Sequence, residues 1–125
     1  MAGTVTASIV KNDSTSPTVF QNVNGTEIGQ LCRAWVSFTG STGVILKSFN
    51  VLTVTRNAVG DYSITFTNNL ADGDYVVAPS YLNPGTNPNY VLHALSQTSS
   101  VARVVMNGAA GSAADPTTAY IAVFR

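Results

Sequence analysis

The sequence of 125 residues is short of the residue types on which most site chemistry depends. It has one cysteine and one histidine, and only 10% of its residues are charged, against roughly 25% in an average domain. One cysteine cannot form a disulfide within the chain, so core burial or contacts between chains must supply the stability. Six basic residues balance six acidic ones, which leaves no net basic charge for nucleic acid. Apolar runs are short, and none approaches the roughly 18 residues that would cross a membrane.

Small polar residues take the place of the missing charges. The chain holds 12 Ser, 15 Thr and 11 Asn. A hydrophobic content of 45% is too high for a disordered chain, and the heptads of a coiled coil are absent. The composition therefore predicts one neutral all-β domain.

The apolar residues alternate with polar ones, which is the period of a β-strand. The clearest strand spans residues 31–38, and the cleanest amphipathic one spans residues 62–67. The dipeptide Asn24-Gly25 predicts a type I′ hairpin, and Pro79 predicts an edge strand or a bulge. Further strands are expected at residues 18–23, 26–28, 44–50, 51–56, 75–81, 90–96, 101–106 and 118–124, where 44–56 could also be one bent strand.

This pattern predicts an antiparallel β-sandwich, either jelly-roll-like or barrel-like. Residues 18–125 form the single sandwich domain. Residues 1–17 form an N-terminal arm or the end of a preceding shaft, because the polar stretch that ends at Pro17 reads as a linker.

The residues with site chemistry are isolated from one another. His93 and Cys32 are far apart in sequence, and a metal site in one chain needs three or four ligands. We interpret His93 as a structural or surface residue, although a threefold axis could gather three copies of it around an ion. Asp72 and Asp74 fit a turn better than the acid pair of a glycosidase or a calcium site. No catalytic residue, no metal site and no cofactor is predicted, and the protein is not expected to be an enzyme.

The aromatic and amide residues around one loop are the best candidates for ligand binding. Tyr81 and Tyr90 flank the loop at residues 82–89, which also carries Asn83, Asn87 and Asn89. Tyrosine rings can stack on the C–H faces of neutral sugars, and amides can bond to sugar hydroxyls. The alternative is that both tyrosines only close the strand ends around the loop. The loop at residues 107–117 is a second candidate surface.

Three consecutive segments resemble the C-terminal domain of tail fibre proteins from tailed bacteriophages. They are FQNVNGTEIG at residues 20–29, CRAWVSFTGSTGVILKSFNV at 32–51 and GDYSITFTNNLADGDYVV at 60–77. The resemblance implies a homotrimeric fibre tip, attached to the rest of the tail fibre, that contacts the host cell surface. It implies structural roles for the matched residues, namely Cys32, Arg33, Ala34, Trp35, Val36, Phe38, Asp61 and Tyr62. The His-x-His ligands that bind iron in some fibre tips are absent here.

These expectations combine into one functional reading. The chain is a receptor-binding domain on the virion, outside the host cell, and its loops contact a surface glycan or protein without inserting into the membrane. Both faces of the strand at residues 31–38 carry large apolar groups, which fits a cover supplied by a second chain or by the N-terminal arm. The alternative function is a structural virion module, such as a knob, a collar or a capsid decoration. A polysaccharide-degrading tailspike domain is a third reading.

Overall fold

The chain divides into two compact units, Met1–Leu31 and Cys32–Arg125. The computed structural model of the protein describes residues 20–29, 31–82, 85, 89–108 and 111–125. The boundary expected after residue 17 falls outside these described residues. The ribbon at residues 20–29 groups with the first unit rather than with the sandwich.

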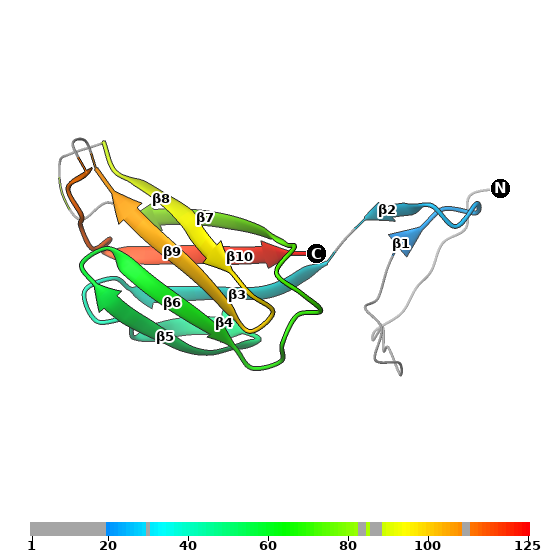
Figure 1. The fold of residues 1–125 in the computed structure, drawn as a ribbon, viewed down its shortest axis with the longest axis horizontal. Helices are drawn as coiled ribbons and strands as arrows, with labels where there is room; N and C mark the ends of the chain where they lie inside the picture. The colour runs from blue at the N-terminus through cyan, green and yellow to red at the C-terminus, as the bar shows by residue number, and fades with distance from the viewer. Residues whose placement is uncertain (1–19, 30, 83–84, 86–88, 109–110) are drawn as a thin grey trace. The chain divides into compact units, whose positions relative to one another are not determined.

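The described part of the first unit is a two-stranded antiparallel ribbon of β1 (Phe20–Gln21) and β2 (Glu27–Gly29) (Figure 1). The expected hairpin is present, but the type I′ turn was wrong. Gly25 has a φ of 77° and its N–H donates to Asn22 O at 3.0 Å, whereas Asn24 has no positive φ. The turn is therefore a type I turn that ends in a left-handed glycine. The Asn22 side chain favours this geometry, because its Oδ1 accepts the N–H groups of Asn24 and Thr26, each at 3.0 Å.

The second unit is all-β and consists of two four-stranded antiparallel sheets (Figure 1). Sheet 1 has the order β4-β3-β10-β7, formed by Ile45–Phe49, Cys32–Thr39, Thr118–Phe124 and Val76–Leu82. Sheet 2 has the order β5-β6-β9-β8, formed by Val51–Ala58, Asp61–Phe66, Val101–Asn107 and Val91–Gln97. Across the described residues no ladder joins the two sheets, so the unit is a sandwich and not a closed barrel. The same residues contain no helix long and apolar enough to span a bilayer.

The core lies between the sheets and follows the alternation of the sequence. On β6 the residues Tyr62, Ile64 and Phe66 are buried, and their neighbours are only half-buried. On β3 the buried positions are Ala34, Val36 and Phe38, whereas Trp35 on the other face is exposed. The same periodicity on β9 and β10 completes the core with Ala102, Val104, Met106, Ala119, Ile121 and Val123.

The segment at residues 44–56 forms two strands in different sheets and not one bent strand. A single residue, Asn50, links β4 of sheet 1 to β5 of sheet 2 with a φ of 54°. Asparagine tolerates this left-handed conformation better than most residues. Its side chain also bonds to both sides of the crossing, with Nδ2 donating to Arg33 O at 3.0 Å and Oδ1 accepting Asn68 N at 2.8 Å.

The edge predicted from Pro79 is confirmed, because β7 is the outermost strand of sheet 1. Proline has no N–H to donate, so an edge position leaves the ladder intact. The last three strands lie within one residue of their expected bounds.

Candidate functional site

The two candidate loops leave the sandwich from the same end. Thr117 N donates to Leu82 O at 3.0 Å, and Val91 is paired with Asn107 in the ladder of β8 and β9. These contacts bring the end of β7, the start of β8, the end of β9 and the start of β10 together (Figure 1). We refer to this region as the loop end. Two segments that are separate in the sequence could therefore contribute to one surface.

Tyr81 and Tyr90 are tied to each other at the base of the loop end. The Tyr81 hydroxyl donates to the Tyr90 carbonyl, and both rings are half-buried against the core. The Tyr90 ring also packs on Gly108, where an added Cβ would lie 2.7 Å from Cε1. These contacts give both tyrosines a role in closing the strand ends. Ligand stacking by the remaining exposed parts of the rings stays a prediction.

Of the three asparagines predicted to bind a ligand at this loop, the structure describes one. Asn89 is described and exposed, next to Tyr90. Asn83 and Asn87 lie outside the described residues. The geometry of the amide groups at the loop end is therefore known in part only.

The loop that precedes β10 is held by Asp115, which lies next to Pro116. Its carboxylate accepts Arg56 Nη2 at 2.7 Å, Gly60 N at 2.9 Å and the Tyr62 hydroxyl at 2.6 Å. Partial burial of Asp115 raises its pKa, but hydrogen bonds from Arg56, Gly60 and Tyr62 outweigh burial and hold the pKa below its usual value. Burial and the bond to Asp115 raise the pKa of Tyr62. Asp115 thus joins the loop end to β5 and β6.

A second carboxylate, Asp61, lies on the outer face of sheet 2. Arg103 Nε donates to Asp61 Oδ1 at 2.9 Å, and Asn57 Nδ2 donates to the same oxygen at 3.0 Å. The hydrogen bond from Arg103 lowers the pKa of Asp61, partial burial opposes this shift, and Asn57 adds to it. The two charges compensate each other, so the pair adds no net charge to this face.

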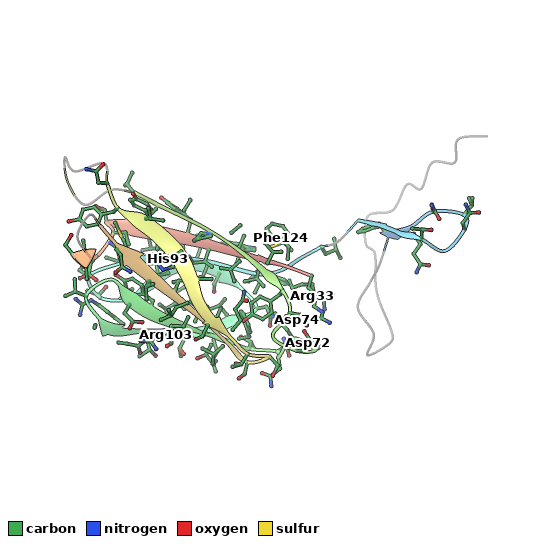
Figure 2. All side chains as sticks on the ribbon, turned by 45° about the horizontal axis from the view of Figure 1, so that its top comes forward. Arg33, Asp72, Asp74, His93, Arg103 and Phe124 are labelled. Carbon is green, nitrogen blue, oxygen red and sulfur yellow. The ribbon has the colours of Figure 1, made fainter. Side chains whose placement is uncertain are left out.

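Asp72 and Asp74 make local hydrogen bonds in the turn at the opposite end of the sandwich. Asp74 N donates to Asp72 Oδ1 at 2.8 Å, which is the expected turn contact. Arg125 pairs with the Asp72 carboxylate and also donates to Asp74 O at 3.0 Å. Figure 2 shows both aspartates together, well away from Arg103. This arrangement favours the turn interpretation over a glycosidase pair or a calcium site.

The lone histidine and the lone cysteine lie on different strands, β8 and β3, which belong to different sheets. His93 is exposed on β8, opposite Val105 (Figure 2). Cys32 is half-buried, and its thiol donates to Ala34 O at 3.3 Å. Throughout the described part of the chain, no three His, Cys, Asp or Glu side chains gather in a way that could hold a metal ion.

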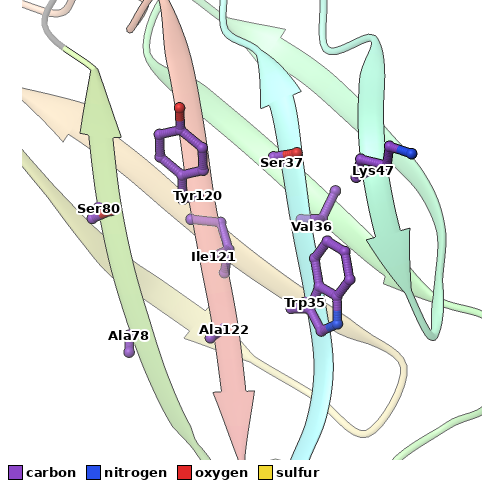
Figure 3. A pocket seen from close by; sticks show the side chains of 9 residues that line it. All are labelled: Trp35, Val36, Ser37, Lys47, Ala78, Ser80, Tyr120, Ile121 and Ala122. Carbon is purple, nitrogen blue, oxygen red and sulfur yellow. The ribbon is translucent and has the colours of Figure 1, made fainter.

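The outer face of sheet 1 carries a hollow that the sequence pattern does not predict. It has a volume of about 470 Å³, and its rim and floor include Trp35, Tyr120, Ala78, Ser80 and Ala122 (Figure 3). The only available signal was the pair of apolar faces on the strand at residues 31–38. A hollow of this size has room for roughly 15 water molecules. Such water wets an almost wholly apolar surface, which favours its replacement by another molecule.

The described groups at these two surfaces are tyrosine hydroxyls, an amide and aromatic rings. The loop end offers half-buried tyrosines and an exposed amide, and the outer face of sheet 1 offers aromatic rings. Comparisons with family models, with curated proteins and with solved structures find no significant match to this chain.

Proposed function

We propose that the protein is the C-terminal receptor-binding domain of a phage tail fibre. In this proposal three copies form the tip of the fibre, which joins the rest of the tail fibre and attaches the virion to the host cell surface. The receptor is a carbohydrate or another outer-surface group, contacted by the loops and not chemically altered. The domain acts on the virion, outside the host cell.

One observation carries the proposal beyond the sequence resemblance. The loops at residues 82–89 and 107–117 both rise from the loop end, where Leu82 and Thr117 are joined by a backbone hydrogen bond of 3.0 Å. A receptor could therefore touch both loops at once. Because each described group there is neutral apart from the internally paired Asp115, the contacts would be hydrogen bonds and ring stacking.

The strength of attachment would come from repetition. A single neutral hydrogen bond contributes only about 1 kcal/mol. Three identical loop ends on one fibre tip convert weak sites into strong attachment, because the second and third contacts form at a high effective concentration.

Host adsorption by the purified protein tests this function. Asn89→Ala removes an amide from the loop end, and the matched control Asn69→Ala removes one from the opposite end, between β6 and β7. We expect Asn89→Ala to weaken adsorption about fivefold per copy, which corresponds to about 1 kcal/mol. Asn69→Ala should adsorb as the unmodified protein does. Equal adsorption by all three proteins would exclude the loop end as the receptor surface.

A second function is favoured by the contacts of the tyrosines. Tyr81 and Tyr90 pack against the core, and the Tyr81 hydroxyl donates to the Tyr90 carbonyl, which is also what a structural virion module would need. A glycan array and a host-cell pull-down separate the two functions. Binding to neither would favour the structural module, and Tyr81→Phe, which keeps the ring, would then alter stability alone.

A further inference from the structure

The outer face of sheet 1 is an apolar surface that spans all four strands. Its large side chains are well exposed: Trp35 by 41%, Phe49 by 55%, Tyr120 by 46%, Phe124 by 38%, Val76 by 64% and Leu82 by 54%. Single exposed apolar residues are ordinary, but a contiguous group of this extent marks a contact surface. The question is which molecule covers it.

The shape of the face is a ridge beside a hollow. Ladder pairing places Ala78, Ala122, Trp35 and Phe49 in one row across β7, β10, β3 and β4. The half formed by β3 and β4 carries the two large rings, and the other half of the row carries two methyl groups. The hollow of about 470 Å³ lies over Ala78 and Ala122 and extends past Trp35 and Tyr120 to Ser37 and Lys47 (Figure 3).

This shape is complementary to itself. When two such faces meet, the ridge of Trp35 and Phe49 on one copy can enter the hollow over Ala78 and Ala122 on the next. The same contact can repeat around a closed ring, because each copy offers one ridge and one hollow. A ridge and a hollow of matching chemistry on a single chain favour a second copy over an unrelated partner.

The charges on the face also permit a copy to bind. None of the described residues that point outward from sheet 1 is acidic, and the basic ones are Arg33 and Lys47, of which Lys47 lines the hollow from its β4 side. Lys47 lies on the edge strand β4, and Arg33 lies near the first residue of β3. Both side chains are long enough to keep their charges in water while the centre of the face is covered. Association therefore does not bury a charge without a partner.

The area is sufficient for a specific contact. An aromatic side chain offers about 200 Å² of surface, so the four exposed rings alone present roughly 350 Å². Their aliphatic and hydroxyl neighbours on the same strands bring the face toward the roughly 800 Å² per partner of an ordinary interface. The largest apolar patch of a typical monomer is roughly 300–600 Å².

We propose that a second copy of this chain covers the outer face of sheet 1, with the Trp35–Phe49 ridge of one copy seated in the Ala78–Ala122 hollow of the next. The inference rests on the homo-oligomer of the proposed function and assigns the surface that forms it. It is independent of which receptor the loop end binds.

Molar mass in solution, measured by light scattering with the full chain, tests this surface. Trp35→Glu removes the ridge, Ala78→Arg fills the hollow, and Thr55→Arg places the same charge on the outer face of sheet 2. Ala78 and Thr55 are both exposed, so neither substitution enters the core. We expect the unmodified protein and Thr55→Arg to show a multiple of the 13.0 kDa chain mass. Trp35→Glu and Ala78→Arg should be monomeric at the same concentration, with association weakened at least tenfold.

A mixture of the two variants sharpens the test. The Trp35→Glu chain keeps its hollow and the Ala78→Arg chain keeps its ridge, so one intact contact remains between them. Mixing should therefore produce a complex of two chains that neither variant forms alone. Thermal unfolding of each variant verifies the fold, and Ala78→Arg keeps the test valid if Trp35→Glu is unstable.

The contradicting outcomes separate this inference from the proposed function. An unmodified oligomer whose mass is unchanged in both variants would overturn the surface but leave the homo-oligomer standing. An unmodified protein that is monomeric at every concentration would overturn both the surface and the homo-oligomer. Host adsorption by the loop end is measured separately, so its result stays distinguishable.

Discussion

The two sheets of the sandwich have similar inner faces and different outer faces. Inside, both contribute alternating apolar side chains to one core. Outside, the β5–β6 half of sheet 2 presents the hydroxyl groups of Thr53, Thr55, Ser63 and Thr65 and the Asp61–Arg103 pair. Its edge strand β8 exposes the aliphatic side chains of Val91 and Leu95. Sheet 1 instead presents the aromatic rings of Trp35, Phe49 and Tyr120.

This difference separates the requirements of folding from those of contact. The inner faces must be apolar in any sandwich, because the core is what stabilises it. The outer faces have no such requirement, so their chemistry reflects their surroundings. The hydroxyl-bearing half of sheet 2 is suited to water, and the aromatic face of sheet 1 is suited to an apolar cover, which we propose to be a second copy.

The largest expected change in the free energy of unfolding comes from the buried side of β3, which differs from its exposed side. Phe38 on β3 is fully buried, with its ring 4.9 Å from that of Tyr62, whereas Trp35 on the same strand points outward. Phe38→Ala should lower the free energy of unfolding by about 3–5 kcal/mol, because it removes a buried ring and leaves a cavity.

The matched substitution on the outer side of β3, Trp35→Ala, should lower the free energy of unfolding far less. Under dilute conditions Trp35→Ala should lower the free energy of unfolding by less than about 1 kcal/mol. Urea titration of both variants measures the two values. Equal losses in dilute solution would mean that the outer face of sheet 1 belongs to the core of the isolated chain.

An intermediate effect is expected where Asp115 joins the loop end to sheet 2. The Asp115 carboxylate accepts hydrogen bonds from Arg56, Gly60 and Tyr62, and Asp115→Asn removes its charge. We expect this change to lower the free energy of unfolding by about 1–3 kcal/mol. Asp74→Asn is the control, because in the described structure only the backbone of Asp74 is hydrogen-bonded. A thermal shift assay compares them, and a smaller loss in Asp115→Asn than in Asp74→Asn would refute this role.

The same carboxylates predict the response to acid. The pKa values of Asp61 and Asp115 are lowered in the folded state, so their stabilisation is complete above the unfolded value of about 3.9. It is lost as the pH falls through the lower folded pKa values. The free energy of unfolding should therefore decrease below about pH 4, with a shallower decrease in Asp115→Asn. Contacts through the outer face of sheet 1 contain no carboxylate and should not share this dependence.

The smallest expected effect on stability gives the sharpest contrast between the faces. Ser80 on sheet 1 and Thr53 on sheet 2 are both exposed hydroxyl residues. Ser80→Glu and Thr53→Glu should each change the unfolding free energy of the monomer by no more than about 0.5 kcal/mol. Only Ser80→Glu should reduce association, because it places a charge in the hollow. Sedimentation that shows equal association for both variants would remove the distinction between the two outer faces.

The fold follows from the sequence wherever period-two alternation decides a side chain's direction. Tyr62, Ile64 and Phe66 on β6 are buried as the pattern predicts. On β3 the pattern gives the two faces but not which of them is buried, and the structure buries the face of Ala34, Val36 and Phe38. Pro79 correctly predicts an edge, since a missing N–H is a local property of one residue. The separation of β4 from β5 was open, because it depends on the left-handed backbone of Asn50 and its bonds to Arg33 and Asn68.

The contacts between distant segments could not be predicted in the same way. Arg56 and Asp115 are 59 positions apart, and nothing in their neighbourhoods identifies them as a pair. The type I′ turn was wrong because Asn-Gly fits two hairpin geometries, and the Asn22 side chain selects the other one. The hollow of sheet 1 required knowledge that Ala78 and Ala122 lie beside Trp35 in the ladder. The asparagines and tyrosines of the loop end remain predicted ligand groups, with Tyr81 and Tyr90 also serving as packing groups.

Trp35 is the only tryptophan of the chain, which makes its fluorescence a direct measurement of the ridge. Acrylamide quenching over a dilution series, together with the molar mass at each concentration, reports whether a second copy covers the ring. If a second copy covers the ring, quenching should be weak at high protein concentration. It should become stronger on dilution, as the molar mass falls toward the 13.0 kDa of one chain. In the Ala78→Arg variant quenching should be strong at every concentration. Quenching that stays the same at every concentration while the mass falls would contradict the claim that a second copy covers this face.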